Sequence, residues 1–430
     1  MTVTTKRFIS SRKSCSCSMP GVWRAVAYMT GAVVIFHSPR ACAHIARTMD
    51  INSHYRTMAE SMREDLPTVP LLSSQLEEKH SIFGGGDRLD RCIDFAVKEY
   101  KPELLVIACS CLAGVIGDDV LAVAADAERK YGIPVLASES CGFLDGEYYQ
   151  GYFEIASKLM DRYFKPQEKE PGTALLVGDN GGPWGTYARE TTRMLEAMGV
   201  KVLGQFPGYV PVKDLPSLTR AETAVILGGR GYTRKEMTEL GNRFADEYGM
   251  KVMQEEFPVG WSHTLLWIGA MGRLLGKEEE AALVRQQEEE RFAKAVEKYR
   301  TVTEGKKTVV CIARLLMYFH PAAVMETIRN LGLDLTGVVF LDVYDEKSRK
   351  EMEDAVRSLT DAPFYNASEA DGLLKEADVV LTTHELADRS LRQIFLPMLP
   401  LVGAAGETRF METIYRVLKS KICRGGVIYV

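Results

Sequence analysis

Three cysteines stand in short segments that end an apolar run or lie at a chain turn. They are Cys17 in C-S-M-P-G, Cys42 in F-H-S-P-R-A-C and Cys111 in C-L-A-G-V-I-G-D-D. Iron–sulfur clusters are held by thiolates, and three thiolates carried by three separate loops suit such a cluster better than a disulfide. The competing interpretation is that these cysteines are small apolar residues buried without a role. Because the three segments contain no C-x-x-C pair, spacing alone leaves both interpretations open.

Two short apolar runs are expected to position Cys42 and Cys111. Residues 33–37 (V-V-I-F-H) precede Cys42, and residues 104–109 (L-L-V-I-A-C) precede Cys111. Runs of this kind predict buried parallel strands. Ligands of open α/β sheets bind outside the carboxyl ends of the strands, where both cysteines would lie. The motif G-D-D at 117–119 is expected to open a helix with acidic residues in its first turn.

Alternation of strands and helices continues to the end of the chain and predicts an α/β fold. We expect three successive Rossmann-like, doubly wound domains with parallel sheets. The predicted boundaries are 1–165 for the domain with the three cysteines, 166–303 for the second and 304–430 for the third. The first boundary lies at the start of a charged, proline-bounded linker at 165–172, after which the elements of the second domain begin. Predicted strands include 134–137, 174–178, 201–203, 224–228, 251–253, 308–311, 337–341 and 378–381. Predicted helices include 87–100, 120–129, 187–198, 233–248, 322–331, 346–359 and 407–418.

Composition excludes several classes of protein. The 430 residues carry a net charge of −5 and no long block of Lys and Arg, so nucleic acid is not an expected partner. No apolar stretch reaches the roughly 18–20 residues that a membrane span needs, and the N-terminus lacks the apolar region of a secretory signal. We therefore expect a cytoplasmic protein without a membrane partner. There, nine cysteines are expected to be reduced or metal-bound.

The three segments together resemble the component-1 proteins of the nitrogenase superfamily. That family has a cysteine followed by a small pair and glycine, then H-G-x-x-G-C, then C-x-x-x-x-I-G-D-D. This chain has C-S-M-P-G, H-S-P-R-A-C and C-L-A-G-V-I-G-D-D at the corresponding places. Further similar segments are I-F-G-G-G at 82–86, Y-K-P-E-L-L-V-I at 100–107, Y-G-I-P-V at 131–135, G-F-L-D-G at 142–146 and E-Y-G-M-K-V-M at 247–253.

The resemblance implies a role for the three cysteines. It makes Cys17, Cys42 and Cys111 ligands of an iron–sulfur cluster at the interface with a homologous, alpha-type subunit that supplies the remaining ligands. The cluster would be an eight-iron centre of the P-cluster type or a four-iron 4Fe-4S centre. A separate iron protein would hydrolyse ATP and deliver single electrons, and the assembly would be a heterotetramer. Near a family position that contacts the cluster, Cys141 is an additional, weaker candidate.

Two departures indicate which subunit the chain resembles. The catalytic subunit of a nitrogenase binds a second metal cofactor through a cysteine that starts a helix in its second domain and a histidine in a late loop of its third. The comparable stretches here are 230–237, which has no cysteine, and the predicted loop 401–411, which has no histidine. The chain is therefore expected to be a beta-type, oxidoreductase subunit that relays electrons to a substrate site on its partner. Methylthio-alkane reductase and dinitrogen reductase are both candidate systems.

Two other functions stay open from the sequence. The same superfamily contains scaffold proteins on which a metal cofactor is assembled, and these carry the same three cysteines. A Rossmann-type binding protein without metal is the third hypothesis. Among the remaining residues, His37 is expected to orient the turn that holds Cys42, and the glycine-rich stretch 179–185 to line an interface or cavity. The other cysteines are expected to be spare, buried or structural thiols: Cys15, Cys92, Cys109, Cys311 and Cys423.

Overall fold

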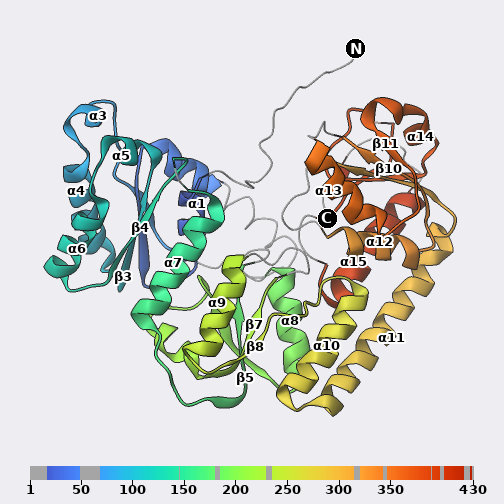
Figure 1. Cartoon of the computed structure of the whole chain (residues 1–430), viewed down its shortest axis with the longest axis horizontal. Coiled ribbons are helices and arrows are strands. Elements are labelled where there is room, and N and C mark those ends of the chain that lie inside the picture. The colour runs from blue at the N-terminus through green and yellow to red at the C-terminus, as the bar shows by residue number, and fades with distance from the viewer. Residues whose placement is uncertain are drawn as a thin grey trace.

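The computed structural model describes residues 17–48, 68–144, 146–179, 185–228, 235–313, 320–341, 346–388, 390–397, 401–420 and 427–428. It contains three parallel sheets of four, four and six strands, each flanked by helices (Figure 1). The predicted α/β fold with three Rossmann-like sheets is therefore confirmed, whereas the boundaries at 165/166 and 303/304 stay predictions. Among the described residues, none of the helices is both long and apolar enough to cross a membrane.

The first sheet has the strand order β2-β1-β3-β4. Alternate residues of its central strands face opposite sides: Val34 and Phe36 pack toward α1 and α7, and Val33 and Ile35 toward α4 and α6. The sheet is thus covered by helices on both faces. Its elements are α1 (Met19–Arg24), β1 (Ala32–His37), β2 (Leu71–Ser73), α3 (His80–Phe83), α4 (Gly86–Tyr100), β3 (Leu104–Cys109), α5 (Cys111–Ile116), α6 (Val120–Tyr131), β4 (Val135–Cys141) and α7 (Tyr148–Tyr163).

The strand order of this sheet reverses between β1 and β3. From β1 the chain crosses to β2 on one side, and β3 then pairs with β1 on the other, so that His37 lies beside Cys109 at the carboxyl ends of both strands. Such a reversal opens a crevice between the two following loops, and that crevice is the usual ligand site of open α/β sheets. The loops that meet here hold Cys42 and Cys111.

The second sheet repeats the same order with its own four strands, β6-β5-β7-β8. Its apolar residues belong to the same continuous core cluster as α1, α7 and one face of the first sheet. The first two sheets therefore share one hydrophobic core. The elements are β5 (Glu170–Val177), α8 (Thr186–Ala197), β6 (Lys201–Phe206), the 3₁₀ helix η1 (Val212–Arg220), β7 (Ala221–Ile226), α9 (Lys235–Asp246), β8 (Lys251–Met253) and α10 (Trp261–Leu275).

The third sheet has the order β11-β10-β9-β12-β13-β14, which is the complete 3-2-1-4-5-6 order of dinucleotide-binding folds. One prediction here was wrong: the stretch 401–411 is mostly helical and not a loop, because α15 already begins at Gly403. The elements are β9 (Lys307–Ile312), α12 (Pro321–Asn330), β10 (Asp334–Phe340), α13 (Glu346–Arg357), β11 (Phe364–Asn366), η2 (Ala367–Glu369), α14 (Asp371–Glu376), β12 (Val379–Thr382), β13 (Gln393–Phe395), α15 (Gly403–Lys419) and β14 (Val427–Ile428).

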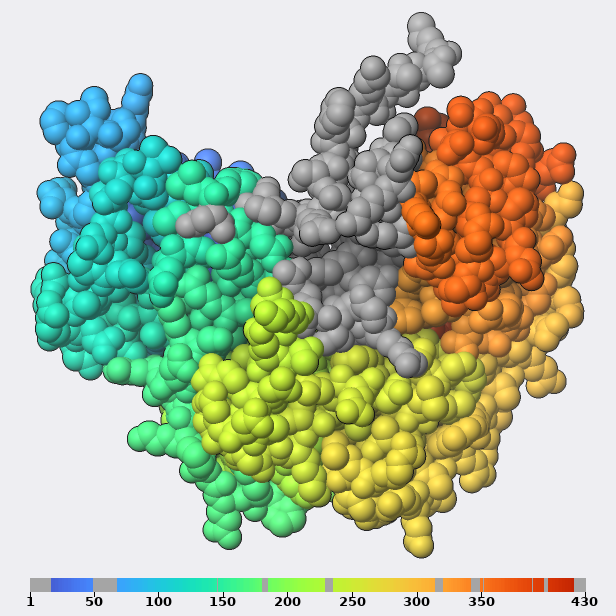
Figure 2. All heavy atoms as spheres, viewed as in Figure 1, coloured from blue at the N-terminus to red at the C-terminus, as the bar shows by residue number. Residues whose placement is uncertain are grey.

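A long helix, α11 (Glu278–Thr303), joins the second and third sheets and packs against α10 and α15. Its buried Glu288 forms an ion pair with Arg193 of α8 at 2.9 Å and accepts the backbone N–H of Ala404 at 3.1 Å. One carboxylate of α11 thus connects this helix to both α8 and α15. In space the three units follow one another in an arc (Figures 1 and 2).

Candidate metal centre

The structure places Cys42 and Cys111 at the carboxyl ends of neighbouring strands, as the sequence predicts. Cys42 lies near the start of the helical residues 40–48, five residues after β1, and Cys111 is the first residue of α5, two residues after β3. The side chain of Ser110 caps α5 by accepting the N–H of Ala113 at 3.2 Å. Both cysteines are half-buried, so their thiols lie at the edge of the core.

These two thiols influence each other. Burial raises the pKa of the Cys42 thiol, and the neighbouring Cys111 raises it further, whereas a hydrogen bond with Ser38 acts in the opposite direction. Two adjacent thiolates repel each other, so ionising both requires a compensating positive charge. Metal ions supply such a charge and deprotonate the thiols that bind them. The local electrostatics therefore fit a cationic group between Cys42 and Cys111.

Cys17 also lies at the carboxyl end of this sheet. It is half-buried and directly precedes Ser18, whose N–H donates to the carbonyl of Gly142 at 3.3 Å and whose hydroxyl donates to the carbonyl of Ser140 at 3.4 Å. These bonds fix Cys17 beside the carboxyl end of β4. The three predicted cysteines thus lie shortly after, or next to, the carboxyl ends of β1, β3 and β4.

The donor set fits a cluster better than a single metal ion. Among the residues that the structure describes, no group of three or more His, Cys, Asp and Glu side chains converges closely enough to hold one metal ion. An iron–sulfur cluster is several atoms wide, and its thiolates surround it without meeting at one point. Soft thiolate sulfur also selects iron–sulfur clusters over oxygen-seeking cations. The half-buried thiols of Cys17, Cys42 and Cys111 are of the chemical kind that such a cluster requires, and their joint ligation stays a prediction.

A buried polar network fixes the turn between β1 and Cys42. Nε2 of His37 lies 2.9 Å from Oδ2 of Asp118, and Nδ1 lies 2.9 Å from the hydroxyl of Ser74. That hydroxyl also accepts the N–H of Ser38 at 3.2 Å, so it donates to Nδ1, and Nε2–H donates to Asp118. Burial lowers the pKa of His37, although the hydrogen bond and charge of Asp118 act in the opposite direction. The lowered pKa keeps the ring neutral. The expectation that His37 orients this turn has a structural basis.

Asp118 does not play the role predicted from its position. It was expected to lie in the first turn of a helix, but Asp119 caps α6 by accepting the N–H of Ala122 at 3.0 Å. Asp118 points instead to the N–H of Gly85, which both of its oxygens accept, at 2.9 and 3.1 Å. A Cβ atom at Gly85 would lie 2.7 Å from Oδ2 of Asp118 and 2.4 Å from Leu76, so a larger residue there would have to displace these side chains. This carboxylate joins the I-F-G-G-G, H-S-P-R-A-C and I-G-D-D motifs.

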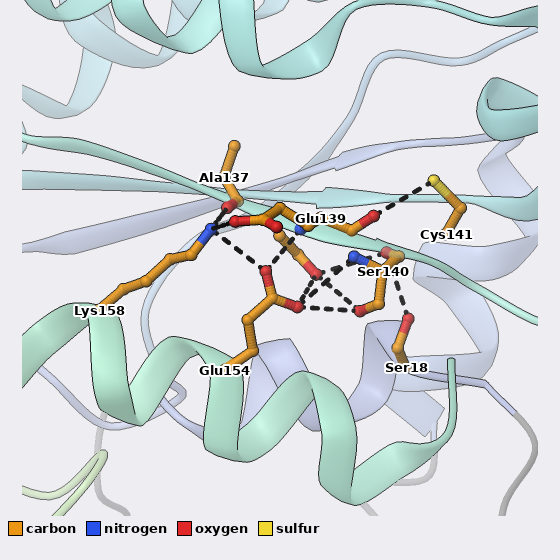
Figure 3. A network of polar contacts seen from close by, with 8 residues as sticks. Ser18, Ala137, Glu139, Ser140, Cys141, Glu154 and Lys158 are labelled. Carbon is orange, nitrogen blue, oxygen red and sulfur yellow. Dashed lines mark hydrogen bonds and ion pairs between the residues drawn. The ribbon is translucent and has the colours of Figure 1, made fainter. Parts of the chain in front are cut away.

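A bulge at the end of β4 is a feature that the sequence did not reveal. Ile107 pairs with Ala137, but the next pair is Cys109 with Cys141, so that residues 138–140 of β4 oppose one residue of β3. Glu154 of α7 secures the bulge by accepting the hydroxyls of Ser138 and Ser140 at 2.8 and 3.0 Å and the N–H of Glu139 (Figure 3). Lys158 donates to the carbonyl of Ala137 at 2.7 Å and pairs with Glu154 at 3.2 Å (Figure 3).

The bulge brings Cys109 and Cys141 together, with their Sγ atoms 3.1 Å apart. Burial raises the pKa of the Cys92 thiol to about 11 and that of the Cys311 thiol to about 12, which favours the neutral thiols. Their structural roles stay predictions. Cys15 and Cys423, for which spare or structural roles are predicted, lie outside the described residues, as do most of the stretches 179–185 and 230–237.

Comparison with known proteins identifies the family. The model of the nitrogenase component 1 type oxidoreductases matches residues 17–419, which is nearly the whole chain. The chain belongs to this family. The predicted superfamily is thereby confirmed, while the beta-type assignment stays a proposal.

Curated relatives of the component 1 family include three differently named kinds. The chain is 28% identical to a nitrogenase iron-molybdenum cofactor biosynthesis protein NifE from Clostridium pasteurianum, covering 71% of this chain and 64% of that protein. It is 24% identical to a nitrogenase molybdenum-iron protein alpha chain from Acidithiobacillus ferridurans (74% and 63%) and 27% identical to a beta chain from Bradyrhizobium diazoefficiens (68% and 59%). The chain thus spans about three fifths of the length of these relatives.

A solved structure supports the fold. The one titled "Nitrogenase Cp1 at pH 5" superposes with a TM-score of 0.69 at 16% identity, and covers 97% of this chain and 90% of its own. The chain has similar sequence identities to the cofactor biosynthesis protein, the alpha chain and the beta chain, so these identities do not show which of the three roles it has.

Large apolar side chains are exposed on the elements that surround Cys17, Cys42 and Cys111. They lie on the helical residues 40–48, on α3, on α5 and just after β4. Two of these elements touch, since α3 contacts α5. Leu144 also reaches α5, because a Cβ atom at Gly114 would lie 2.9 Å from it. Monomeric proteins rarely expose such groups together. The residues are Ile45, Ile82, Phe83, Val115, Phe143 and Leu144, exposed by 54–84%.

Proposed function

We propose that this chain is the beta-type, cluster-holding subunit of a two-component, ATP-dependent reductase of the nitrogenase kind. Cys17, Cys42 and Cys111 would hold the iron–sulfur cluster together with ligands from a homologous, alpha-type subunit. When bound, such a cluster accepts and donates single electrons. The observation that carries the proposal is the position of the thiols of Cys42 and Cys111 on neighbouring loops at the strand reversal of the first sheet.

The surroundings of the three cysteines support a shared cluster. Their thiols are half-buried in this chain alone, and the six exposed apolar residues lie on the elements next to them. A partner subunit seated on this surface would exclude water from the thiolates and cover the apolar groups. Burial and hydrogen bonds around the sulfurs are what set the reduction potential of such a centre. We therefore propose that the alpha-type subunit covers this face, in a heterotetramer that an iron protein with ATP reduces.

Sequence differences support a subunit without the substrate site. The stretch 230–237 contains no cysteine and the stretch 401–411 no histidine. Around residue 402 the structure has the beginning of α15, where Glu288 accepts the N–H of Ala404. Substrate reduction would then occur on the alpha-type partner. The substrate could be a thioether, as in methylthio-alkane reductases, or dinitrogen.

A scaffold for assembly of a metal cofactor is the second candidate function. The relatives named as iron-molybdenum cofactor biosynthesis proteins favour it, since one of them is 28% identical over 71% of the chain. Both functions need the same three cysteines, so the site itself does not separate them.

Iron and sulfide analysis tests the shared part of the proposal. The chain is isolated without oxygen together with its partner subunit, and iron and acid-labile sulfide are measured in wild type, Cys42→Ala, Cys111→Ala and Cys92→Ala. We expect at least a severalfold loss of both elements in the first two variants and none in Cys92→Ala, whose thiol is also half-buried but lies on α4. An iron content near zero in wild type, or an unchanged iron content in Cys42→Ala, would rule out the proposed cluster.

Turnover separates the two functions. The complex is mixed with its iron protein, ATP and a reductant, and reduction of protons, acetylene and a thioether is followed. The relay proposal expects product formation that is lost in Cys42→Ala and retained in Cys92→Ala. A complex that retains its iron, reduces none of these and hands a metal cofactor to a second protein would instead be a scaffold.

A further inference from the structure

We propose that Cys109 and Cys141 form a redox-active dithiol that closes into a reversible disulfide, separate from the three cysteines assigned to the cluster. Their Sγ atoms lie 3.1 Å apart, and the two residues are direct neighbours on parallel strands β3 and β4. Neighbouring strands are about 4.8 Å apart, within the Cα separation of about 4.4–6.8 Å that a disulfide spans. Forming the bond therefore needs side-chain rotation and no movement of the strands.

The bulge in β4 creates this pair. With regular pairing beyond Ile107 and Ala137, Cys109 would face Glu139. The extra residues of the bulge shift the strand so that Cys141 lies opposite Cys109 instead. Glu154 holds the bulge through the two serine hydroxyls and a backbone N–H, and the thiol of Cys141 lies 3.7 Å from the carbonyl of Glu139 (Figure 3). A polar network thus maintains the position of Cys141.

The sheet itself separates the pair from two of the proposed cluster ligands. Cys109 packs in the core on the α4 and α6 face together with Cys141, whereas Cys17 and Cys42 pack against the core on the α1 and α7 face. Closing the pair would therefore consume neither of these thiols. It also leaves Cys111 unreacted, because Cys109 and Cys141 take each other as partners.

The two thiols differ in access, which gives the reaction an order. Cys109 is 3% exposed, whereas Cys141 is half-buried beneath α5. Gly114 leaves the necessary space, since a Cβ atom there would lie 3.0 Å from Sγ of Cys141. Cys141 is therefore the thiol that meets an oxidant from solution, and Cys109 is the resolving thiol behind it.

The oxidant that we assign is a low-molecular-weight disulfide. The thiolate of Cys141 attacks one of its sulfurs, which forms a mixed disulfide and releases one small thiolate. The thiolate of Cys109 then attacks Sγ of Cys141, forms the Cys109–Cys141 bond and releases the second small thiolate. Two protein thiols lose two electrons and two protons, and the small disulfide becomes two thiols. An excess of small thiol reverses both steps.

The bond would act on the loop that carries Cys111. Cys109 precedes it by two residues, and the backbone of Gly142 lies against it, since a Cβ atom at Gly142 would be 2.7 Å from the nitrogen of Cys111. A disulfide would tie both segments together directly beneath α5. The oxidation state of the dithiol therefore controls how freely Cys111 can move.

Thiol titration of the full chain in mixtures of glutathione and its disulfide tests this proposal. Cluster-free protein is equilibrated from reducing to oxidising mixtures, quenched with an alkylating reagent and mapped by mass spectrometry without reduction. We expect wild type to lose two alkylated thiols together, to give a cross-linked peptide pair containing Cys109 and Cys141, and to regain both thiols on reduction. Cys92→Ser should behave like wild type, and Cys109→Ser and Cys141→Ser should form no cross-link.

Several outcomes would overturn the proposal. They are a cross-link of Cys42 to Cys111 in place of the expected pair, a Cys141 that remains fully alkylated in every mixture, and a cross-link that reductant cannot reverse. Circular dichroism of Cys141→Ser shows whether a missing cross-link reflects the missing thiol or a lost fold. Glu154→Gln provides a second variant with both thiols intact, and it should lower the yield of the cross-link at least severalfold. An unchanged yield would contradict the role of the bulge.

Discussion

Oδ2 of Asp118 and Nε2 of His37 lie 2.9 Å apart, although 81 residues separate them in the chain. The same carboxylate accepts the N–H of Gly85, so it joins the segment before Cys42, the segment after Cys111 and the glycine-rich turn at 84–86. Hydrogen bonds that a carboxylate accepts in a buried site are stronger than those that a neutral acceptor makes. Asp118 therefore holds the loops of Cys42 and Cys111 in register.

Asp118→Asn should loosen this part of the molecule. The amide nitrogen of asparagine would have to face either the N–H of Gly85 or the imidazole N–H, and two donors cannot form a hydrogen bond with each other. Losing a hydrogen bond to a charged group costs roughly 1.5–3 kcal/mol of stability. We expect amide hydrogen exchange at residues 84–89 to accelerate by about ten- to a hundredfold. Asp119→Asn is the matched control, because asparagine caps a helix as well as aspartate. Equal exchange rates in both variants would show that Asp118 does not stabilise this region more than Asp119 does.

Glu154→Gln should release the bulge in β4. The side-chain amide can replace only part of a carboxylate that serves two hydroxyls and a backbone N–H and also pairs with Lys158. We expect faster hydrogen exchange at residues 138–141 and faster alkylation of Cys141, both by about tenfold or more. Glu139→Gln makes the same chemical change at a side chain that is 68% exposed, and it should leave both rates within about twofold.

Asp179→Asn should destabilise the contact between the parts of the chain that hold the first and second sheets. Burial opposes the charge of Arg24, but the interactions with Asp179, Tyr209 and Tyr148 together outweigh it, so the pKa of Arg24 lies well above its ordinary value. Asp179 also accepts the hydroxyl of Tyr209 at 2.7 Å. Leaving a buried guanidinium without its counter-ion costs about 3 kcal/mol or more. Calorimetry should show a lower unfolding temperature, whereas Asp126→Asn, which breaks an exposed pair with Arg129, should change it little.

Glu407→Gln should remove a pH dependence of stability. Glu407 is buried in α15, accepts the hydroxyl of Thr327 at 2.7 Å, and has no donor among the described residues for its other oxygen. Burial raises its pKa to about 8. The folded protein therefore keeps this carboxyl protonated while the unfolded chain ionises it near pH 4.5. The stability contributed by the protonated form is complete below that pH and is lost as pH rises to about 8.

The measurement follows from this sign. Each pKa unit corresponds to about 1.4 kcal/mol, so the stability gained by Glu407→Gln relative to wild type should grow from about pH 4.5 to pH 8 and then level off. Unfolding temperatures recorded across pH 5–9 give this difference directly. Glu412→Gln on the same helix, where the side chain pairs with Arg416 at the surface, should show no such growth. A constant difference at every pH would mean that Glu407 is ionised in the folded protein.

The sequence predicted those parts of the fold that depend on local pattern. Apolar β-branched runs located β1 and β3 and hence the carboxyl ends where Cys42 and Cys111 lie. Local pattern failed at α15, where Gly403, Ala404 and Gly406 resemble a loop although helix packing needs small residues at this crowded end. Local pattern also contains no sign that Glu407 is buried, because a glutamate among polar neighbours resembles a helix surface position.

The rest of the candidate site depends on contacts between distant segments. Asp118 follows a glycine and precedes a helix, which predicts a capping role, and only the folded chain brings Gly85 and His37 to it. The pairing of Cys109 with Cys141 depends on a strand register that neither strand encodes by itself. A bulge secured by Glu154, 14–16 residues away in the sequence, has no signature within β4.

The shared hydrophobic core of the first two sheets has a consequence for synthesis on the ribosome. Arg24 meets Asp179 155 residues later, and the N–H of Tyr28 meets the carbonyl of Gly208. While only the first sheet has emerged, one face of it has helices α1 and α7 but lacks the apolar residues of the second sheet that complete the core. The core of the nascent chain therefore remains incomplete until β5 to β8 have been translated. Until then, the uncovered apolar face depends on protection from aggregation.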